Sequence, residues 1–483
     1  MVKKSLDIKS ITALFAFTFL IVGIKFMIVA SYGNITPFWD QWDAQADKLY
    51  RPFLEGTLDW KELVAPHNEH RVFTGRLLAL LLFVINGNLW NPLAEMVVNA
   101  LLHTLALVVA VYGIGKSMFG KSTRIVFFLF AVLLFSIPLG WENILTNNSS
   151  LSFILLFSFI FLLALSTANH GSLLWYIIVG ASALLCCLSY ASGALTLASG
   201  IVFLAVQWLT GVRRDKTSIA MMVLLTLSLI AAVHFTPTIA GHSSFKSKNI
   251  LDFVIALLRT TGGLVLYIPS VLFMLKQLRR PPASNDSSWF LFALSLWVFG
   301  QILLLCYGRS HGVLASRYFD IYAIGLAVNF ASLLVLIKDG SSRLFKPAMQ
   351  TWLVLVFLGL GFFFPDVAGN LEKRRAEGHE QKQNVRAYLK TKDVAFLQDK
   401  SPGSIPYPEP ARLKTLLDNV TIQSFLPKIL FESGTPEETA ASERFAAIFF
   451  ATGSLLTGAG AGLFFILLFS IADPLSLSDS RCV

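Results

Sequence analysis

The sequence has 483 residues, of which 55% are hydrophobic and 14% charged, and it carries a formal net charge of +10. A soluble protein of this length cannot bury so much apolar surface, so the composition excludes a soluble enzyme and favours a chain that crosses a membrane many times. The lysines and arginines lie mainly beside apolar runs, as expected where they orient membrane helices, so nucleic acid is not an expected partner.

Apolar runs long enough to cross a hydrocarbon layer of roughly 30 Å occur along most of the chain. They predict an all-α polytopic membrane protein with about 12 transmembrane helices, in a range of 11–13. The expected spans are residues 10–31, 91–114, 123–140, 150–167, 173–190, 193–210, 217–239, 251–277, 288–307, 317–337, 347–365 and 444–472.

Basic clusters separate several of these runs and fall on one side of the predicted topology. They contain Lys116, Lys121, Arg124, Arg213, Arg214, Lys216, Lys276, Arg279, Arg280, Lys338, Arg343 and Lys346. By the positive-inside rule this side and both termini are cytoplasmic. We therefore expect a multi-pass membrane protein whose polar loops face the side opposite to the cytoplasm.

Two apolar segments need separate treatment. Residues 72–86 are short and contain Arg76, so we expect them to lie in the interface or re-enter the membrane without crossing it. In the last span, Gly458 and Gly462 have the spacing of a helix-packing motif.

This topology predicts three regions. Residues 1–365 form a transmembrane catalytic module that includes a first outer loop over 32–90. Residues 366–443 form a small outer subdomain, and 444–483 contain the last span and a cytoplasmic tail. Residues 401–410 contain four prolines, so we expect them to be extended.

The first outer loop begins with two carboxylates among tryptophans. Asp40 and Asp43 are three residues apart, so on a helix they share one face. A carboxylate at a membrane interface is costly unless it is paired or used, and either one is a candidate general base. The alternative is that Asp40 caps a helix whose first turn contains Asp43.

The same loop contains a second polar cluster. His67, Glu69, His70 and Arg71 lie within five residues of each other. Such side chains bind sugars, phosphates or anionic head groups. The spacing is not that of the H-E-x-x-H zinc motif, so a divalent metal is possible but not favoured. The alternative is a polar helix start at the interface.

Glu95, Asn99 and His103 are spaced by four within the second expected span and line one helix face. Ionisable groups inside a membrane normally face a cavity or the bundle interior. We expect Glu95 to extend the polar zone of the first loop toward a substrate. Hydrogen bonding between helices is the alternative, chiefly for Asn99 and His103.

Five more candidates for substrate binding lie near the outer ends of later spans. Glu142 follows the third span, Arg259 lies within the eighth, and Arg309, Arg317 and Tyr318 flank the loop after the ninth. Arginine stays charged and donates two hydrogen bonds at once, which suits a phosphate. The alternative for Arg309 and Arg317 is snorkelling to lipid head groups.

Together these features resemble the GT-C class of integral-membrane glycosyltransferases. The resemblance lies in the apolar first helix, the aspartate-bearing outer loop, the many spans and the small outer domain. The short segments over 38–43, 65–71, 141–143 and 405–408 also resemble those of bacterial membrane proteins grouped with that class. The plan is similar to that of the O-antigen serotype-converting glucosyltransferases.

The resemblance implies that a sugar moves from a polyprenyl-phosphate donor to a hydroxyl of a lipid-linked glycan or other cell-envelope acceptor, on the periplasmic face. It places the base at Asp40 first and Asp43 second, and the phosphate-holding side chains at Arg309 and Arg317. Many members have a neighbouring Asp-Glu pair, whereas here Gln41 follows Asp40. A single base on the attacking side implies inversion.

Two other classes of function fit parts of this pattern. A transporter or flippase of lipid-linked sugars would need polar residues across the whole membrane, whereas here they concentrate in the outer half. A glycan polymerase or ligase would use the same lipid-phosphate substrates. No cofactor is required if arginines neutralise the leaving phosphate.

Overall fold

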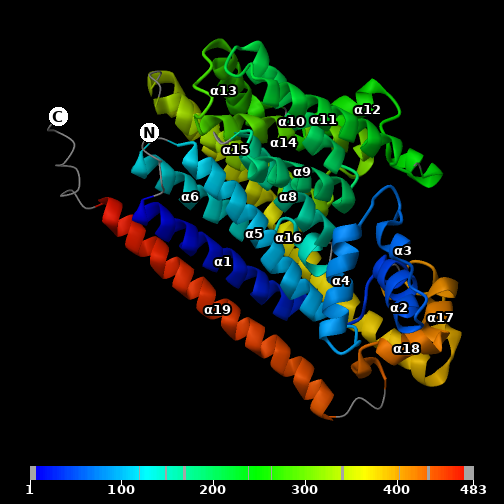
Figure 1. The fold of residues 1–483 in the computed structure, drawn as a ribbon. Coiled ribbons are helices and arrows are strands. Elements are labelled where there is room, and N and C mark those ends of the chain that lie inside the picture. Colours follow the sequence, from blue (N-terminus) through cyan, green and yellow to red (C-terminus); the bar gives the residue numbers. More distant parts are fainter. Residues whose placement is uncertain are drawn as a thin grey trace.

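The computed structural model describes residues 7–118, 120–146, 149–166, 170–237, 239–262, 264–338, 342–401, 403–431 and 436–472. Long helices lie side by side, and a group of short helices covers one end of them (Figure 1). We call this end, which carries α2 (Arg51–Leu54), α3 (Trp60–Val64), α17 (Pro410–Asp418) and α18 (Val420–Phe425), the loop end. The opposite end carries the basic clusters, and we call it the basic end.

The longer helices are α1 (Ile8–Tyr32), α5 (Pro92–Lys116), α6 (Lys121–Ser136), α8 (Ser149–Ser166), α9 (Leu173–Ser189), α10 (Gly193–Leu209), α11 (Lys216–His234), α12 (Ile250–Thr260), α13 (Ile268–Arg279), α14 (Ser288–Gly308), α15 (Phe319–Lys338), α16 (Ser342–Thr391) and α19 (Pro436–Ala472). The shorter elements are η1 (Trp42–Tyr50), α4 (Phe73–Ile85), α7 (Trp141–Leu145), η2 (Ala240–Phe245), η3 (Val265–Tyr267), η4 (Ser310–Gly312), η5 (Ser316–Tyr318), η6 (Val394–Phe396) and η7 (Lys428–Leu430). Side-chain caps stabilise several helix starts, such as Asp7 on α1 and Asn91 on α5.

Eight helices in the described part of the chain are long and apolar enough to cross a membrane, and a ninth span results if α12 and α13 count as one. Three more expected spans are present as the shorter apolar helices α6, α9 and α10, so the count of about 12 is not established. The continuous helix expected over 251–277 is instead two helices that meet at 61°. Gly262 and Leu264 at this break have positive φ angles of 57° and 72°, which a right-handed helix does not contain.

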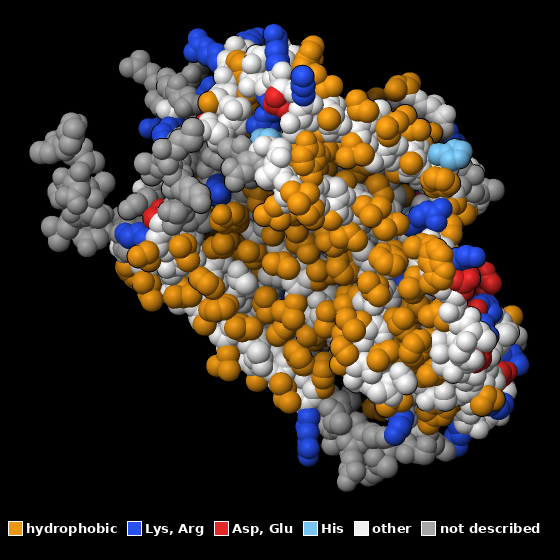
Figure 2. Space-filling view, viewed as in Figure 1, with side chains coloured by type: hydrophobic (Ala, Val, Ile, Leu, Met, Phe, Trp, Pro, Cys, Tyr) orange, Lys and Arg blue, Asp and Glu red, His pale blue; other side chains and the backbone are white. Residues whose placement is uncertain are grey.

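Contacts between helix ends show which loops share an end. At the basic end, Arg124 at the start of α6 pairs with Asp7 at 3.1 Å, and Ser287 Oγ donates to Lys116 O at 2.6 Å. The expected basic cluster around Lys116 and Arg124 therefore lies beside the start of α1. Hydrophobic side chains cover much of the face between the two ends (Figure 2).

α4, within the apolar stretch 72–86, both begins and ends at the loop end. Its 13 residues reach about 20 Å, which is short of a hydrocarbon layer of roughly 30 Å. Arg76 is 4% exposed, and its guanidinium donates to the carbonyls of Glu62 and Ala65 at the end of α3. The buried arginine thus donates hydrogen bonds to carbonyls that have no partner within the short helix α3. Through this contact α4 supports the loop that contains α3.

A separate hydrophobic core joins the first outer loop to the C-terminal outer segment. Residues of η1, α4, α16, α17 and α18 share it, and its fully buried members include Trp42, Tyr50, Tyr388 and Phe425. α16 continues without a break past residue 365 to Thr391, and its C-terminal part forms one side of this core. The two regions that are expected on the outer side therefore fold against each other.

The last helix, α19, packs along α1 through small residues, but not through the expected pair. Cβ atoms built at Gly458 and Gly462 meet no atom within 4 Å, so these glycines face away from the contact and the expected packing motif is wrong. Instead, a Cβ at Gly453 would lie 2.7 Å from the carbonyl oxygen of Gly23. Backbones approach closely where no Cβ intervenes.

We expect Gly453→Leu to lower the apparent thermal unfolding midpoint, because its side chain would collide with the α1 backbone at a cost of about 1–3 kcal/mol. Gly458→Leu is the matched control, since its position is open. Intrinsic fluorescence of the detergent-solubilised chain during heating measures the midpoint. Equal midpoints for the two variants would contradict this packing.

Candidate active site

The polar cluster expected around His67 forms a tight turn at the loop end and does not start a helix. His67 N donates to His70 O at 2.8 Å, and His70 N donates to His67 O at 3.0 Å. Between them Asn68 has a φ of +52°, a left-handed conformation that asparagine tolerates better than most residues. Because His67 and His70 form a bridge pair, their side chains leave the turn on the same face.

Asp40 faces this turn. The preceding residue, Trp39, has a φ of +50°, an uncommon conformation for a bulky side chain, and its N–H donates to Pro406 O at 2.7 Å. Asp40 Oδ2 lies 3.4 Å from His67 Nε2 while the Asp40 side chain stays 69% exposed. Asp40 does not cap the next element, because Gln41 is the N-cap of η1 and makes no side-chain cap bond.

The environment of Asp40 favours its ionised form. The contact with His67 holds the pKa of Asp40 below its usual value, and the positive charge of Arg317 acts in the same direction. Partial burial opposes both effects but does not outweigh them. The carboxylate is therefore ionised near neutral pH and open to solvent, as a general base must be.

The Glu69 carboxylate links the turn to the end of α14. Arg309 forms an ion pair with Glu69 and stacks over the Phe245 ring at 5.2 Å. His70 lies between this pair and α9: its Nε2 is 3.8 Å from Glu69 Oε1, and its ring stacks on Tyr190 at 3.7 Å. The Arg309 charge is thus held in place, and part of it is already balanced by Glu69.

Glu142 and Arg317 join two turns beside Asp40. Glu142 N donates to Ser316 Oγ at 3.3 Å, and Arg317 N donates to Glu142 Oε2 at 3.0 Å. The Arg317 guanidinium lies 5.4 Å from the centre of the Tyr318 ring, and Arg317 is exposed while Tyr318 is buried. Glu142 therefore holds the Arg317 backbone and leaves the guanidinium available.

Beneath these turns, charged side chains from three helices form a buried chain. Lys25 of α1 contacts His103 Nδ1 of α5, and His103 Nε2 lies 3.1 Å from Asp320 Oδ2 of α15. Asn143 Nδ2 donates to Asp320 at 2.7 Å and to Arg317 O at 2.9 Å. Asp320 therefore fixes α7 against η5, and so fixes the turns that carry Glu142 and Arg317.

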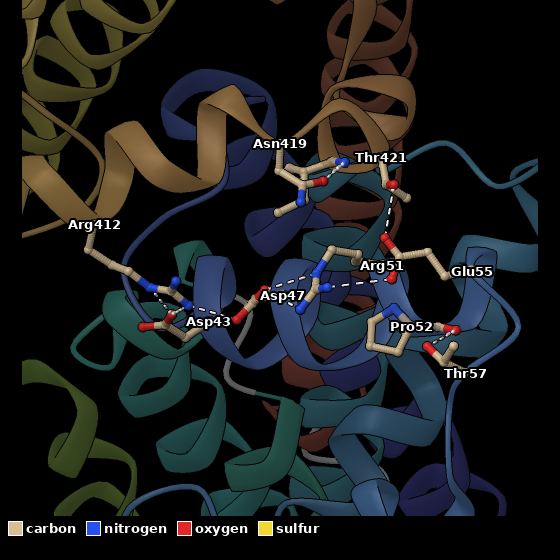
Figure 3. A network of polar contacts seen from close by, with 10 residues as sticks. Asp43, Asp47, Arg51, Pro52, Glu55, Thr57, Arg412, Asn419 and Thr421 are labelled. Carbon is tan, nitrogen blue, oxygen red and sulfur yellow. Dashed lines mark hydrogen bonds and ion pairs between the residues drawn. The ribbon is translucent and has the colours of Figure 1, made fainter.

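Asp43, the second expected base, points to the outer segment. Arg412 Nη2 lies 2.7 Å from Asp43 Oδ1 and 2.7 Å from Asp47 Oδ2, and Tyr407 Oη donates to Asp43. The network continues from Asp47 to Arg51 at 2.8 Å (Figure 3). Both oxygens of the Asp43 carboxylate are bound by these partners, so Asp43 connects η1 to α17.

Glu95 is buried beneath η1 and also has several partners. It accepts hydrogen bonds from Tyr50 Oη at 3.0 Å, Trp90 Nε1 at 3.1 Å and Gln45 Nε2 at 3.2 Å. Asn99 and His103 continue the same buried face of α5, as the spacing predicts. Glu95 thus anchors the first loop on α5 and does not reach the group around Asp40.

Two expected site arginines lie outside this group. Arg71 donates to Val64 O at 2.8 Å and to Phe235 O at 3.0 Å, so it ties loop segments together. Arg259 is exposed in the last turn of α12. The geometry gives neither of them a place beside Asp40, and their roles in binding substrate stay predictions.

The structure thus gathers most of the expected residues in one surface group, which we call the Asp40 cluster. Its members are Asp40, His67, Glu69, His70, Glu142, Arg309, Arg317 and Tyr318. Among the described residues there is no group of three or more His, Cys, Asp or Glu side chains arranged to hold a metal ion. The Asp40 cluster combines an ionised carboxylate, which feels the charge of Arg317, with a second arginine, Arg309, that is paired with Glu69.

Several residues of this region were missed from the sequence. Lys25 and Asp320 lie inside expected spans, where an ionisable side chain is itself a signal of function or pairing. Tyr190 and Arg412 gave no such signal, because a tyrosine at a helix end and an arginine in a polar segment are both common.

No protein-family model matches the chain, and no curated protein matches it. Among solved structures, it is similar to the crystal structure of the Archaeoglobus fulgidus oligosaccharyltransferase in complex with Zn and sulfate, with 14% sequence identity and a TM-score of 0.32. The similarity covers 96% of this chain and 51% of that one, so this chain spans about half the length of the archaeal protein. A likeness of this degree carries no argument about function.

Arg412→Gln should accelerate limited proteolysis between residues 403 and 431, because it removes the ion pairs that connect α17 to η1. Lys414→Gln is the control, since Lys414 pairs within α17 with Asp418 at 2.7 Å. The cleavage rates are measured by mass spectrometry with proteases that do not cut after arginine or lysine, because both substitutions would remove a trypsin site. The connection is refuted if both variants are cleaved at the wild-type rate.

Proposed function

We propose that this protein is an integral-membrane glycosyltransferase that moves a sugar from a polyprenyl-phosphate donor to a hydroxyl of a lipid-linked glycan or other envelope acceptor. The observation that carries the proposal is the Asp40 cluster, in which an exposed, ionised carboxylate lies on the same surface as Arg309 and Arg317. In this proposal the loop end faces the periplasm, and the basic end and both termini face the cytoplasm of a bacterial inner membrane.

The proposed reaction needs a base and a cationic site for the leaving group. The acceptor oxygen attacks the anomeric carbon while Asp40 takes the hydroxyl proton, and the bond between that carbon and the phosphate oxygen breaks. The departing lipid phosphate gains charge, which Arg317 and Arg309 stabilise. One carboxylate on the attacking side gives inversion, by analogy with single-displacement glycosidases.

Support for this assignment comes from two independent sources. The resemblance of residues 38–43 to the GT-C class pointed to Asp40, and the geometry gives Asp40 an open carboxylate whereas Asp43 is engaged by Arg412 and Tyr407. His67 lowers the pKa of Asp40, and Glu69 orients Arg309. No metal is part of this proposal, because the arginines supply the positive charge.

The buried chain of Lys25, His103 and Asp320 is the observation that best fits the rival function, a flippase of lipid-linked sugars. A transport path would continue this polarity to the basic end. Along α5, however, residues 105–111 after Thr104 are all apolar. The buried chain is better explained as support for Arg317, and a glycan polymerase or ligase remains a variant of the proposed chemistry.

Asp40→Asn should lower kcat for acceptor-dependent release of polyprenyl phosphate by roughly 10²–10⁴-fold, the range for loss of a general base. Asp43→Asn is the matched control and should retain most of the activity, because it weakens only the contact between η1 and α17 and leaves the Asp40 carboxylate in place. Purified protein, a lipid-linked sugar and an acceptor suffice for the assay. Full activity of Asp40→Asn would overturn the assignment of the base.

His67→Ala should shift the acidic limb of the pH–kcat/KM profile upward. The base acts only when ionised, and the contact with His67 is the largest influence that lowers the pKa of Asp40. Without this contact the pKa of Asp40 rises, so activity begins to fall at a higher pH. An unchanged limb in His67→Ala would show that another group controls the profile.

A further inference from the structure

A cavity of about 620 Å³ opens at the loop end, on the side of α1 and α19. It is bounded by the end of α1, the start of α5, the outer part of α16 and the start of α19. None of the residues of the Asp40 cluster lines it. Because α1, α5 and α19 are expected to cross the membrane, the cavity lies at the depth where the hydrocarbon meets the head groups.

One wall of the cavity is apolar and spacious. Val29, Leu93 and Phe445 provide hydrocarbon surface, and the small residues Gly33 and Ala376 leave room between them. The volume falls within the range of roughly 300–1,000 Å³ that is usual for small-molecule sites. An apolar wall at this depth suits the glycerol backbone and the first methylenes of a lipid.

The other wall is cationic. Arg375, His379 and Lys382 line the cavity, and their spacing of four and three residues puts them on one face of α16. Glu372, one turn earlier, also lines the cavity and accepts a hydrogen bond from Tyr32 Oη at 3.2 Å. In the part of the chain that the structure describes, Arg375 and Lys382 form no ion pair or hydrogen bond with the protein.

We propose that this cavity binds the phosphate head group of an anionic phospholipid from the leaflet at the loop end. Arg375 and Lys382 donate to the phosphate, and the two cations outnumber the one carboxylate, Glu372, that lines the cavity with them. The lipid chains then run along the apolar wall toward α1 and α19. This site is separate from the proposed glycosyl transfer and does not depend on it.

The test is native mass spectrometry of the full-length protein in mild detergent with phosphatidylglycerol, phosphatidylcholine of the same chains, or sodium phosphate. We expect one phosphatidylglycerol to be retained at least fivefold more than phosphatidylcholine. Arg375→Gln with Lys382→Gln should abolish this preference. Lys373→Gln with Arg386→Gln, which removes two charges of the same helix outside the cavity, should preserve it.

A second variant separates binding from surface charge. Ala376→Phe fills the cavity without changing charge and should also lower retention at least fivefold, with an unchanged elution volume as the check on folding. Equal retention of both phospholipids, equal losses in the two double variants, or full retention by Ala376→Phe would overturn the proposal. Displacement of the lipid by millimolar phosphate would identify a free anion as the ligand and overturn it as well.

Discussion

Burial of aromatic side chains between the first outer loop and the C-terminal outer segment is the constraint on which the loop end depends. Trp42, Tyr50 and Phe425 lose all contact with solvent, and burying each side chain of this size stabilises the fold by about 1.5–3 kcal/mol. Glu95 supports the same core from α5. Asp40 lies at the edge of this core and directly follows Trp39, whose φ angle is positive. The fold therefore sets the direction of the Asp40 side chain before any ligand binds.

Charges buried among the helices are costly, and here they occur where two turns must be fixed. Lys25 and Asp320 carry opposite charges, and His103 lies between them in direct contact with both. Loss of one partner from such a set leaves an uncompensated charge. Asn143 donates hydrogen bonds both to Asp320 and to the backbone carbonyl of Arg317. The position of Arg317 at the surface therefore depends on contacts between helices deep in the bundle.

Local chemistry was predictable from the sequence, whereas pairing between distant segments was not. The length of residues 72–86 predicted a short helix, and α4 has 13 residues, but the partners of Arg76 on α3 were not predicted. Helical spacing predicted that Asp40 and Asp43 share one helix face. Asp40 instead precedes η1, and the left-handed conformation of Trp39 directs it to a different side from Asp43. Arg309 lies 240 residues from Glu69, and no spacing rule reports such a contact. The pattern at Gly458 likewise gave the spacing of a contact but not its face.

The contact between the first and last long helices has a consequence for how the protein is made. α1 leaves the ribosome with Gly23 on its surface, yet its partner Gly453 is synthesised more than 400 residues later. Likewise, the carbonyl of Pro406 that holds Trp39 is synthesised more than 360 residues after Trp39 itself. The nascent chain therefore keeps an unpaired first helix and an unanchored Asp40 until these distant segments have been made, so the Asp40 cluster assembles only after them.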